Sequence, residues 1–184
     1  HSNATFAETI RALDNGANYA VHTFNAMREF SHREPGIAGA VLGDDRVFAE
    51  IIADGLHVHP ATIRLFSRAK KADRILLVTD CTSAAGMPDG RYRLGQDNIT
   101  VKNGECRDAE GRIAGSTLTQ DVALKNFMAW SAFALEDALP ALTVNPAAAL
   151  GLKGKGIIEP GADADLVALD TNFRVVKTWV AGKL

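Results

Sequence analysis

Three short apolar runs alternate with helix-like segments along the first 150 residues, and this order constrains the fold more than any other feature. The runs cover residues 19–21, 47–53 and 75–78. Strands that alternate with helices build parallel sheets from βα units. We therefore predict an α/β chain. Because a closed barrel of this kind needs eight strands, about three units cannot close one.

The segments between these runs carry start and stop signals for helices. Residues 23–44 are rich in turn formers, and we predict a long loop there. We predict a helix over residues 5–13 capped by Asn3, and a helix over residues 60–71 that begins at Pro60. A third helix is expected over residues 118–133, capped by Ser116 or Thr117, and two shorter helical segments over residues 137–142 and 146–150.

Two later segments have the pattern of antiparallel strands. Short alternating runs flank Asn103-Gly104, a strong hairpin turn, and predict a β-hairpin insertion at about residues 91–108. Strands are also expected at residues 166–169 and 175–180. We expect residues 1–150 to form one α/β unit and residues 151–184 to belong to a small β-domain.

The composition excludes several classes of partner. The net charge of -2, without a Lys/Arg cluster among aromatics, argues against nucleic acid. No apolar stretch approaches the roughly 18 residues that cross a bilayer, so we expect no membrane contact. The two isolated cysteines, Cys81 and Cys106, predict neither a zinc knuckle nor a disulfide framework and fit a reducing, cytoplasmic setting.

Histidine and aspartate residues follow the predicted strands. His22, His57 and Asp80 lie at or just past the three apolar runs, and His1 opens the motif HSNAT. The ends of parallel strands are where α/β folds carry catalytic groups. Because histidine is a common metal ligand and a nearby carboxylate can accept a proton from activated water, the pattern suggests a metal-assisted hydrolase.

Each of these residues also has a purely structural interpretation. A histidine beside a strand can be a hydrogen-bonded structural residue, and we assign that role to His32 and His59. Asp80 could cap a helix or stabilise a turn. Arg33 could clamp an anionic group or form a surface ion pair with Glu34 or Asp44.

Two further candidates lie in loops. Asn25 could hydrogen-bond a sugar hydroxyl or a phosphate, or could serve only as a turn residue. Gly115, after Ala114, could let the backbone approach a ligand closely, or could be the loop before a capped helix.

Taken together, the motifs resemble the N-acetylglucosamine-6-phosphate deacetylases of the amidohydrolase superfamily. The resemblance covers nearly all 184 residues in order, and HTFNAM, REPG and DGLHVHP carry more of its specificity than the tail does. The motifs concerned are HSNAT, HTFNAM, REPGIAGA, IIADGLHVHP, LLVTDCTSAAG, RIAGSTLT and the tail GIIEPGADADLVALD.

The resemblance implies a partial (β/α)8 TIM-type barrel, namely its last strands and helices, followed by a β tail from a β-sandwich domain. It implies a divalent metal ion, most often zinc, bound by His1 and His22, with Asp80 as general acid and base. His57 would polarise the acetyl carbonyl or contact the substrate. The remaining substrate-binding residues implied are Asn25, Ala26 and Arg33 for the sugar phosphate, and Ile113, Ala114 and Gly115 along the sugar pocket.

In that family the third protein ligand is a glutamate on an earlier strand, which this sequence lacks. We therefore expect the chain to be the C-terminal half of a longer enzyme, and the resemblance implies a homodimer that acts on a small amino-sugar phosphate. Two alternatives remain open: an amidohydrolase acting on a cyclic amide, and a non-catalytic, truncated sugar-phosphate-binding fragment.

Overall fold

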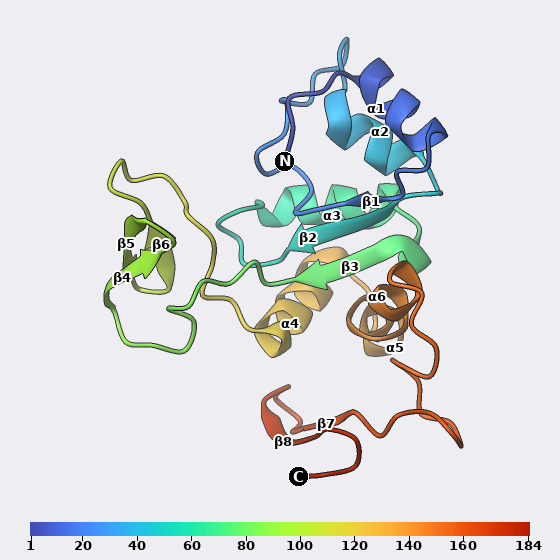
Figure 1. Cartoon of the computed structure of the whole chain (residues 1–184), viewed down its shortest axis with the longest axis vertical. Helices are drawn as coiled ribbons and strands as arrows, with labels where there is room; N and C mark the ends of the chain where they lie inside the picture. Colours follow the sequence, from blue (N-terminus) through green and yellow to red (C-terminus); the bar gives the residue numbers. More distant parts are fainter.

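A computed structural model describes residues 1–184, and its centre is a three-stranded parallel sheet. The strands are β1 (Tyr19–Ala20), β2 (Phe48–Ile52) and β3 (Ile75–Val78), in the spatial order β1-β2-β3 (Figure 1). Both pairs are parallel. The prediction of parallel βα units is confirmed for this part of the chain.

Helices pack against this sheet and against one another. Helix α2 contacts β2 and α3, α3 contacts α4, and α4 contacts β3. The alternation of β2 turns Ala49 and Ile51 toward these helices, where both are fully buried in the main hydrophobic core. The helices are α1 (Phe6–Asp14), α2 (Gly36–Gly43), α3 (Pro60–Ala69), α4 (Gln120–Ser131), α5 (Leu135–Ala138) and α6 (Val144–Ala149), with 3-10 turns at Ala72–Arg74 and Leu139–Leu142.

Helix α2 corrects the prediction that residues 23–44 form one long loop. Its sequence contains three glycines, which disfavour a helix. Burial outweighs this cost, because Ile37 and Val41 join the main core and Ala38 and Ala40 are almost fully buried. The loop is therefore confined to residues 21–35.

The helix caps differ from those predicted. Helix α1 is capped by Thr5 rather than Asn3. The Thr5 hydroxyl accepts a hydrogen bond from the Glu8 backbone N–H, and the Glu8 carboxylate accepts one from the Thr5 backbone N–H. This reciprocal capping box satisfies two N–H groups that would otherwise lack partners. Helix α4 begins after Thr119, later than Ser116 or Thr117 would have placed it.

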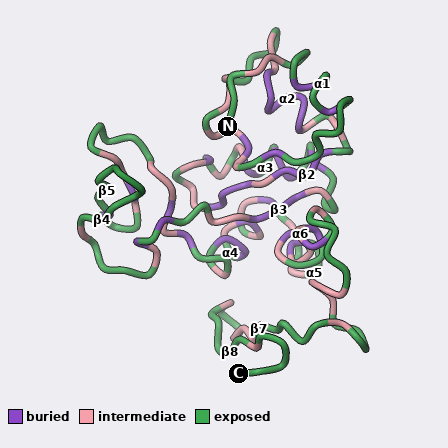
Figure 2. Tube along the Cα trace, in the orientation of Figure 1, coloured by how far each residue is buried: buried purple, intermediate pink, exposed green.

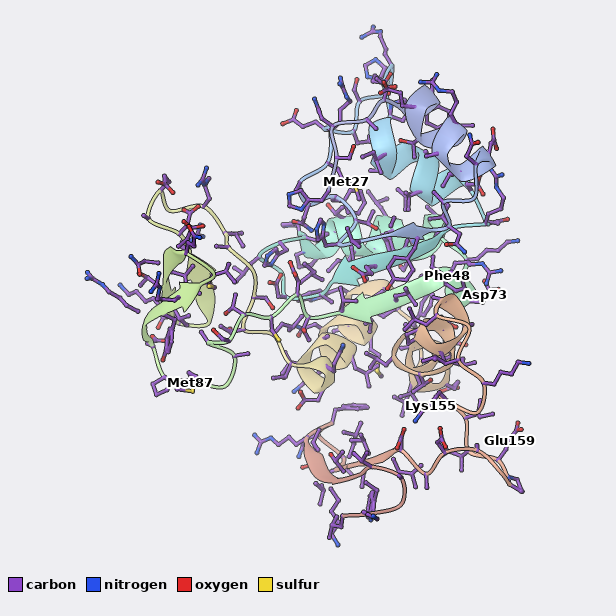
Figure 3. All side chains as sticks on the ribbon, viewed as in Figure 1. Met27, Phe48, Asp73, Met87, Lys155 and Glu159 are labelled. Carbon is purple, nitrogen blue, oxygen red and sulfur yellow. The ribbon has the colours of Figure 1, made fainter.

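The predicted hairpin insertion is a three-stranded antiparallel sheet between β3 and α4. Its strands are β4 (Gly90–Leu94), β5 (Asp97–Lys102) and β6 (Glu105–Arg107), and Asn103 and Gly104 both adopt positive φ at the predicted turn. It stands apart from the helices and has a small core of its own around Ile99 (Figure 1). Met87, in the segment that leads into it, lies below the sheet in the view of Figure 3.

The C-terminal strands β7 (Leu166–Leu169) and β8 (Val175–Trp179) form a separate two-stranded antiparallel ribbon. This ribbon is largely exposed (Figure 2), and Val176 and Val180 are each at least 60% accessible. The chain exposes 11000 Å², whereas a compact monomer of its mass exposes about 8,600 Å². The fold thus leaves apolar surface uncovered. None of its helices has the length and apolar character needed to span a membrane.

The parallel sheet fixes where the predicted site residues emerge. His22, Asp54 and Asp80 each follow the end of a strand within two residues, and parallel strands end at the same edge of a sheet. The arrowheads of β2 and β3 point toward the side that carries the hairpin sheet and the N-terminus (Figure 1). This edge is the region where the predicted site can form.

Candidate functional site

His1 and His22 form the closest pair among the predicted site residues. Nδ1 of His1 lies 3.3 Å from Nε2 of His22, and the two rings meet edge to face at 72°. Zinc binds imidazole nitrogen at about 2.0–2.1 Å, so two nitrogens on one tetrahedral ion lie about 3.3–3.4 Å apart. The two histidines are therefore spaced as two ligands of one ion.

Backbone contacts hold the His1 segment against the loop that follows β1. The Ser2 N–H donates to the Ala26 carbonyl at 3.0 Å, and Ser2 forms an isolated parallel bridge with Met27. Met27 accordingly lies close to the N-terminus (Figure 3). The Arg28 guanidinium also donates to the carbonyl of Asn3 at 3.0 Å. These contacts fix His1 relative to His22.

Glu50 on β2 holds the other half of this pair. Its carboxylate accepts from the His22 backbone N–H at 2.8 Å and from the Tyr19 hydroxyl at 2.7 Å. Burial and this hydrogen bond to a carboxylate raise the pKa of Tyr19 above its ordinary value, so the phenol stays protonated and donates. Glu50 thereby joins β2 to Tyr19 of β1 and to His22 in the loop that follows β1.

Two buried polar atoms beside Glu50 lack partners within the chain. They are Nδ1 of His22 and Oγ1 of Thr23. When one ring nitrogen of a histidine binds a metal, the second ring nitrogen usually donates a hydrogen bond to a carboxylate or a carbonyl. His22 therefore offers one nitrogen to a ligand and keeps the other for a partner that the chain does not supply.

Backbone strain is concentrated around the candidate residues. Eight non-glycine residues adopt positive φ, and four of them lie in the loops after β1 and β3: His22, Phe24, Ala26 and Asp80. Each such residue costs about 1–3 kcal/mol and persists only where the surroundings enforce it, typically at functional sites. Sequence patterns carry no signal for this strain.

Asp80 follows β3 and is exposed. Its carboxylate has no hydrogen-bond or ion-pair partner, so it acts neither as a helix cap nor as a turn carboxylate. Its carbonyl accepts from the Ser116 N–H at 2.9 Å, which brings the loop containing Gly115 alongside. A Cβ on Gly115 would lie 2.7 Å from Cγ2 of Thr82 and 3.2 Å from the Asp80 carbonyl oxygen. Gly115 is needed for this close approach.

His57 is paired with Asp54, a residue that was not among the predicted site residues. Nδ1 of His57 lies 2.5 Å from Oδ2 of Asp54, and both side chains are below 10% exposed. The spacing Asp-Gly-x-His in IIADGLH is the signal that could have identified Asp54. For Glu50, the signal is a single charged residue inside a buried strand.

The loop candidates differ in how far their polar groups are occupied. Arg33 is exposed and forms no ion pair, because the Glu34 carboxylate accepts from the backbone N–H groups of Phe6 and Gly36, and Asp44 pairs with Arg46. The amide nitrogen of Asn25 instead bonds the carbonyls of His22 and Thr23, which fits the turn role. Arg33 is thus the free cation of this loop.

Several candidates are not brought together. No group of three or more His, Cys, Asp or Glu side chains is placed to hold a metal ion, so the chain offers the His1–His22 pair alone. The Ala114 N–H bonds the Cys106 carbonyl, and Ile113 is 39% exposed. His59 is structural, as predicted, because its ring caps α3 by accepting from the Ala61 N–H.

Comparison with known proteins gives consistent matches over the whole chain. The chain is 43% identical over 185 residues to the N-acetylgalactosamine-6-phosphate deacetylase of Escherichia coli O157:H7, with 100% of this chain and 49% of that protein covered. It is 41% identical over 185 residues to the N-acetylglucosamine-6-phosphate deacetylase of Vibrio furnissii, with 100% and 46% covered.

A solved structure matches equally well. The crystal structure of N-acetylglucosamine-6-phosphate deacetylase from Thermotoga maritima superposes with a TM-score of 0.95 at 39% identity, over 100% of this chain and 50% of that chain. The chain spans about half the length of these two curated relatives. The profile of the amidohydrolase family matches residues 1–184, and the chain therefore belongs to the amidohydrolase family.

Proposed function

We propose that this chain contributes half of a metal-dependent deacetylase, which hydrolyses the acetamide of N-acetylglucosamine 6-phosphate to glucosamine 6-phosphate and acetate. The observation that carries the proposal is the 3.3 Å separation between the ring nitrogens of His1 and His22. The names of the similar proteins supply the substrate class. Because the relatives whose names supply this class are about twice as long, we assign the activity to the full-length protein.

His1 and His22 are the residues that would hold a divalent ion, with zinc as the first candidate. Imidazole suits zinc and several other divalent ions, and the family is generally metal-dependent. When bound, such an ion acts as a Lewis acid and lowers the pKa of water in the site. A third protein ligand would come from outside these 184 residues, because the chain supplies no third group at this position.

Asp80 is the residue we propose as general base and general acid. Its carboxylate is unpaired and stands at the strand end, so it is free to take a proton from the attacking water and to return it to the leaving amine. The water adds to the acetyl carbon as the C–N bond breaks. Acetate and the free amine are the products, and the balance of atoms requires no further reactant.

The substrate phosphate is assigned to the loop after β1. Arg33 carries a guanidinium without an ion pair, and a guanidinium binds phosphate through two parallel hydrogen bonds. Asn25 and Ala26 would contact the sugar phosphate beside it, with the Oδ1 atom of Asn25 left for a ligand. His57 would contact the acetyl group or the sugar. Ile113, Ala114 and Gly115 would line the sugar pocket.

The sheet is proposed to be one arc of a (β/α)8 barrel, completed by other parts of the protein. Parallel order, helices that pack in sequence and a surface larger than a compact chain would expose all support this view. In the same way, the exposed ribbon of β7 and β8 is proposed to belong to a small β-domain. A homodimer in the cytoplasm is the expected state of the enzyme.

The direct test is acetate release by the full-length protein and by its Asp80→Asn variant. General acid and base catalysis contributes about 10²–10⁴-fold, so the variant should lose at least about 100-fold in kcat. Asp97→Asn, which removes an exposed carboxylate from β5, is the matched control and should retain full activity. Comparable rates for Asp80→Asn and wild type would refute the role of Asp80.

A second test addresses the phosphate. Arg33→Ala should raise KM for the 6-phosphate at least tenfold and leave turnover of unphosphorylated N-acetylglucosamine unchanged. Arg68→Ala, an exposed arginine on α3, is the control. Turnover of substrates without phosphate, together with indifference to Arg33→Ala, would instead favour a cyclic-amide hydrolase. Calorimetric binding of sugar phosphate without any turnover would favour a non-catalytic fragment.

The substrate could also be the C4 epimer, N-acetylgalactosamine 6-phosphate. This candidate is favoured by the 43% identity with the Escherichia coli O157:H7 enzyme of that name. The two sugars differ only in the orientation of one hydroxyl group. The ratio of kcat/KM for the two phosphates decides between them, and a ratio above one for the galactosamine substrate would replace the first proposal.

A further inference from the structure

The carboxylate of Asp54 holds His57 by accepting three hydrogen bonds. Oδ2 lies 2.5 Å from Nδ1 of the His57 ring, while Oδ1 accepts from the backbone N–H groups of Leu56 and His57 at 2.8 Å each. The same side chain thus fixes both the ring and the backbone of His57. No other polar group of the chain contacts the ring.

The carboxylate of Asp54 is ionised. Burial by itself would raise its pKa, but the hydrogen bonds from the His57 ring and from the His57 and Leu56 backbone outweigh burial and lower the pKa below its ordinary value. An ionised carboxylate only accepts hydrogen bonds. Nδ1 of His57 must therefore carry a proton, whether the ring as a whole is neutral or cationic.

The second ring nitrogen of His57 remains accessible. Nε2 has no hydrogen-bond partner, and it is not sealed from solvent, because the only buried unpartnered side-chain atoms are Nδ1 of His22 and Oγ1 of Thr23. One nitrogen is thus occupied by a buried carboxylate, and the other is open at the strand edge that carries Asp80.

The turn that carries this pair is itself fixed by α4. Gly55 adopts φ +78°, and a Cβ there would lie 3.1 Å from the Trp130 ring. The amide of Asn126 donates to the Ala53 carbonyl at 2.9 Å, directly before Asp54. Helix α4 therefore sets both the position and the direction of the turn after β2.

We propose that Asp54 is a positioning residue that locks His57 in the form with the proton on Nδ1, so that Nε2 is the nitrogen that meets the substrate. The substrate-contacting role of His57 rests on the proposed function. The locked ring form does not, because it follows from the contacts of Asp54 alone. An orienting carboxylate of this kind sets which ring nitrogen is available for chemistry.

The first experiment needs no substrate. The ¹⁵N and ¹H spectra of the histidine rings, recorded on the full-length protein, should contain a protonated Nδ1 signal that His57→Gln removes. Asp54→Asn should lose or strongly shift this signal, because the asparagine amide can also donate. Asp170→Asn is the matched control, since Asp170 accepts from two backbone N–H groups in a similar turn but has no histidine partner. An unchanged His57 signal in Asp54→Asn would overturn the proposal.

The second experiment measures catalysis in a double-mutant cycle. Loss of an orienting partner typically costs about 10–100-fold, so Asp54→Asn should lower kcat at least tenfold with metal content unchanged. In a His57→Gln background the same substitution should cost less than threefold, because Asp54 acts through the ring. An equal loss in both backgrounds would mark a merely structural role and contradict the proposal. If the wild type releases no acetate, the proposed function fails, while the ring spectra still decide the role of Asp54.

Discussion

Nδ1 of His1 lies 3.3 Å from Nε2 of His22, although the two residues are 21 positions apart in the chain. The approach depends on few contacts. The His1 side is tied down by the bond from Ser2 to Ala26 and by Arg28, and the His22 side is tied down by Glu50. The contacts of Arg28 and Glu50 can be removed by substitution without touching either ring, which makes the arrangement testable.

Removal of the Arg28 guanidinium should weaken metal binding without changing a ligand. Arg28→Ala deletes the 3.0 Å bond to the Asn3 carbonyl, and the segment that carries His1 gains freedom. Outer contacts of this kind affect metal affinity by about 10–100-fold. Competition with a fluorescent chelator should show at least a tenfold weaker affinity in the full-length protein, and Arg68→Ala should bind as wild type does. Equal affinities for Arg28→Ala and wild type would show that Arg28 does not position His1.

Truncation of Glu50 should destabilise the protein by leaving the backbone N–H of His22 unpaired. Glu50→Ala removes the acceptor of the part-buried His22 N–H, and an orphaned buried donor costs about 1–3 kcal/mol. It also removes the acceptor of the Tyr19 hydroxyl, which is exposed and can bond water instead. Tyr19→Phe removes one bond only and should cost about 0.5–1.5 kcal/mol. Urea unfolding of the single and double variants measures their coupling. Strict additivity would mean that the two side chains do not interact.

Substitution at Gly115 should disrupt the contact between its loop and Asp80. In Gly115→Ala the alanine would keep a strained φ of +71°, and its new Cβ would lie 2.7 Å from Cγ2 of Thr82. Gly95→Ala has a similar φ of +61° but meets nothing within 4 Å, so it isolates the backbone strain. Overpacking typically adds about 1–3 kcal/mol. Thermal unfolding should therefore rank Gly115→Ala clearly below Gly95→Ala, and equal melting temperatures would contradict the close approach.

Lys70 should make stability depend on pH in the alkaline range. Its ammonium is buried, where it donates to the carbonyls of Val41 and Asp44, and burial lowers its pKa from the ordinary value to about 8. The unfolded chain keeps a lysine pKa of about 10.4. Between about pH 8 and 10.4 the unfolded state binds more protons than the folded state, so the free energy of unfolding rises with pH. Below about pH 8 Lys70 is charged in both states, and the full cost of burying its charge lowers the stability.

The measurement is the unfolding free energy of wild type minus that of Lys70→Met, followed from pH 7 to 10.5. Other titrating groups cancel in this difference, which should increase across the window. A difference that stays flat would show that the ammonium is not desolvated.

The strands were predictable because local signals and tertiary structure agree. The apolar runs before His22, Asp54 and Asp80 are short and end at turn formers, and all three proved to be neighbouring parallel strands. Helix α2 was not predictable from the same signals. Its three glycines and its length of eight residues disfavour an isolated helix, and its packing against α1, α3 and the sheet stabilises it.

The residues of the candidate site were likewise predictable only in part. His1 and His22 could be named from their motifs, and their approach follows from the placement of the loop after β1. Glu50 and Asp54 were missed, because a carboxylate's role here depends on which backbone and ring N–H groups the fold brings to it. Two roles were open for Asn25: its amide nitrogen donates to the carbonyls of His22 and Thr23, as in a turn, while its Oδ1 atom has no partner within the chain.

Whether His1 and His22 bind one metal ion is decided by the metal stoichiometry of the purified full-length protein, measured by elemental analysis for wild type, His1→Ala and His22→Ala. His32→Ala, which alters an exposed loop histidine, is the control. We expect a bound divalent ion in wild type and in the control, and loss of that ion in both site variants. Retention of the ion at wild-type stoichiometry in both His1→Ala and His22→Ala would contradict this expectation.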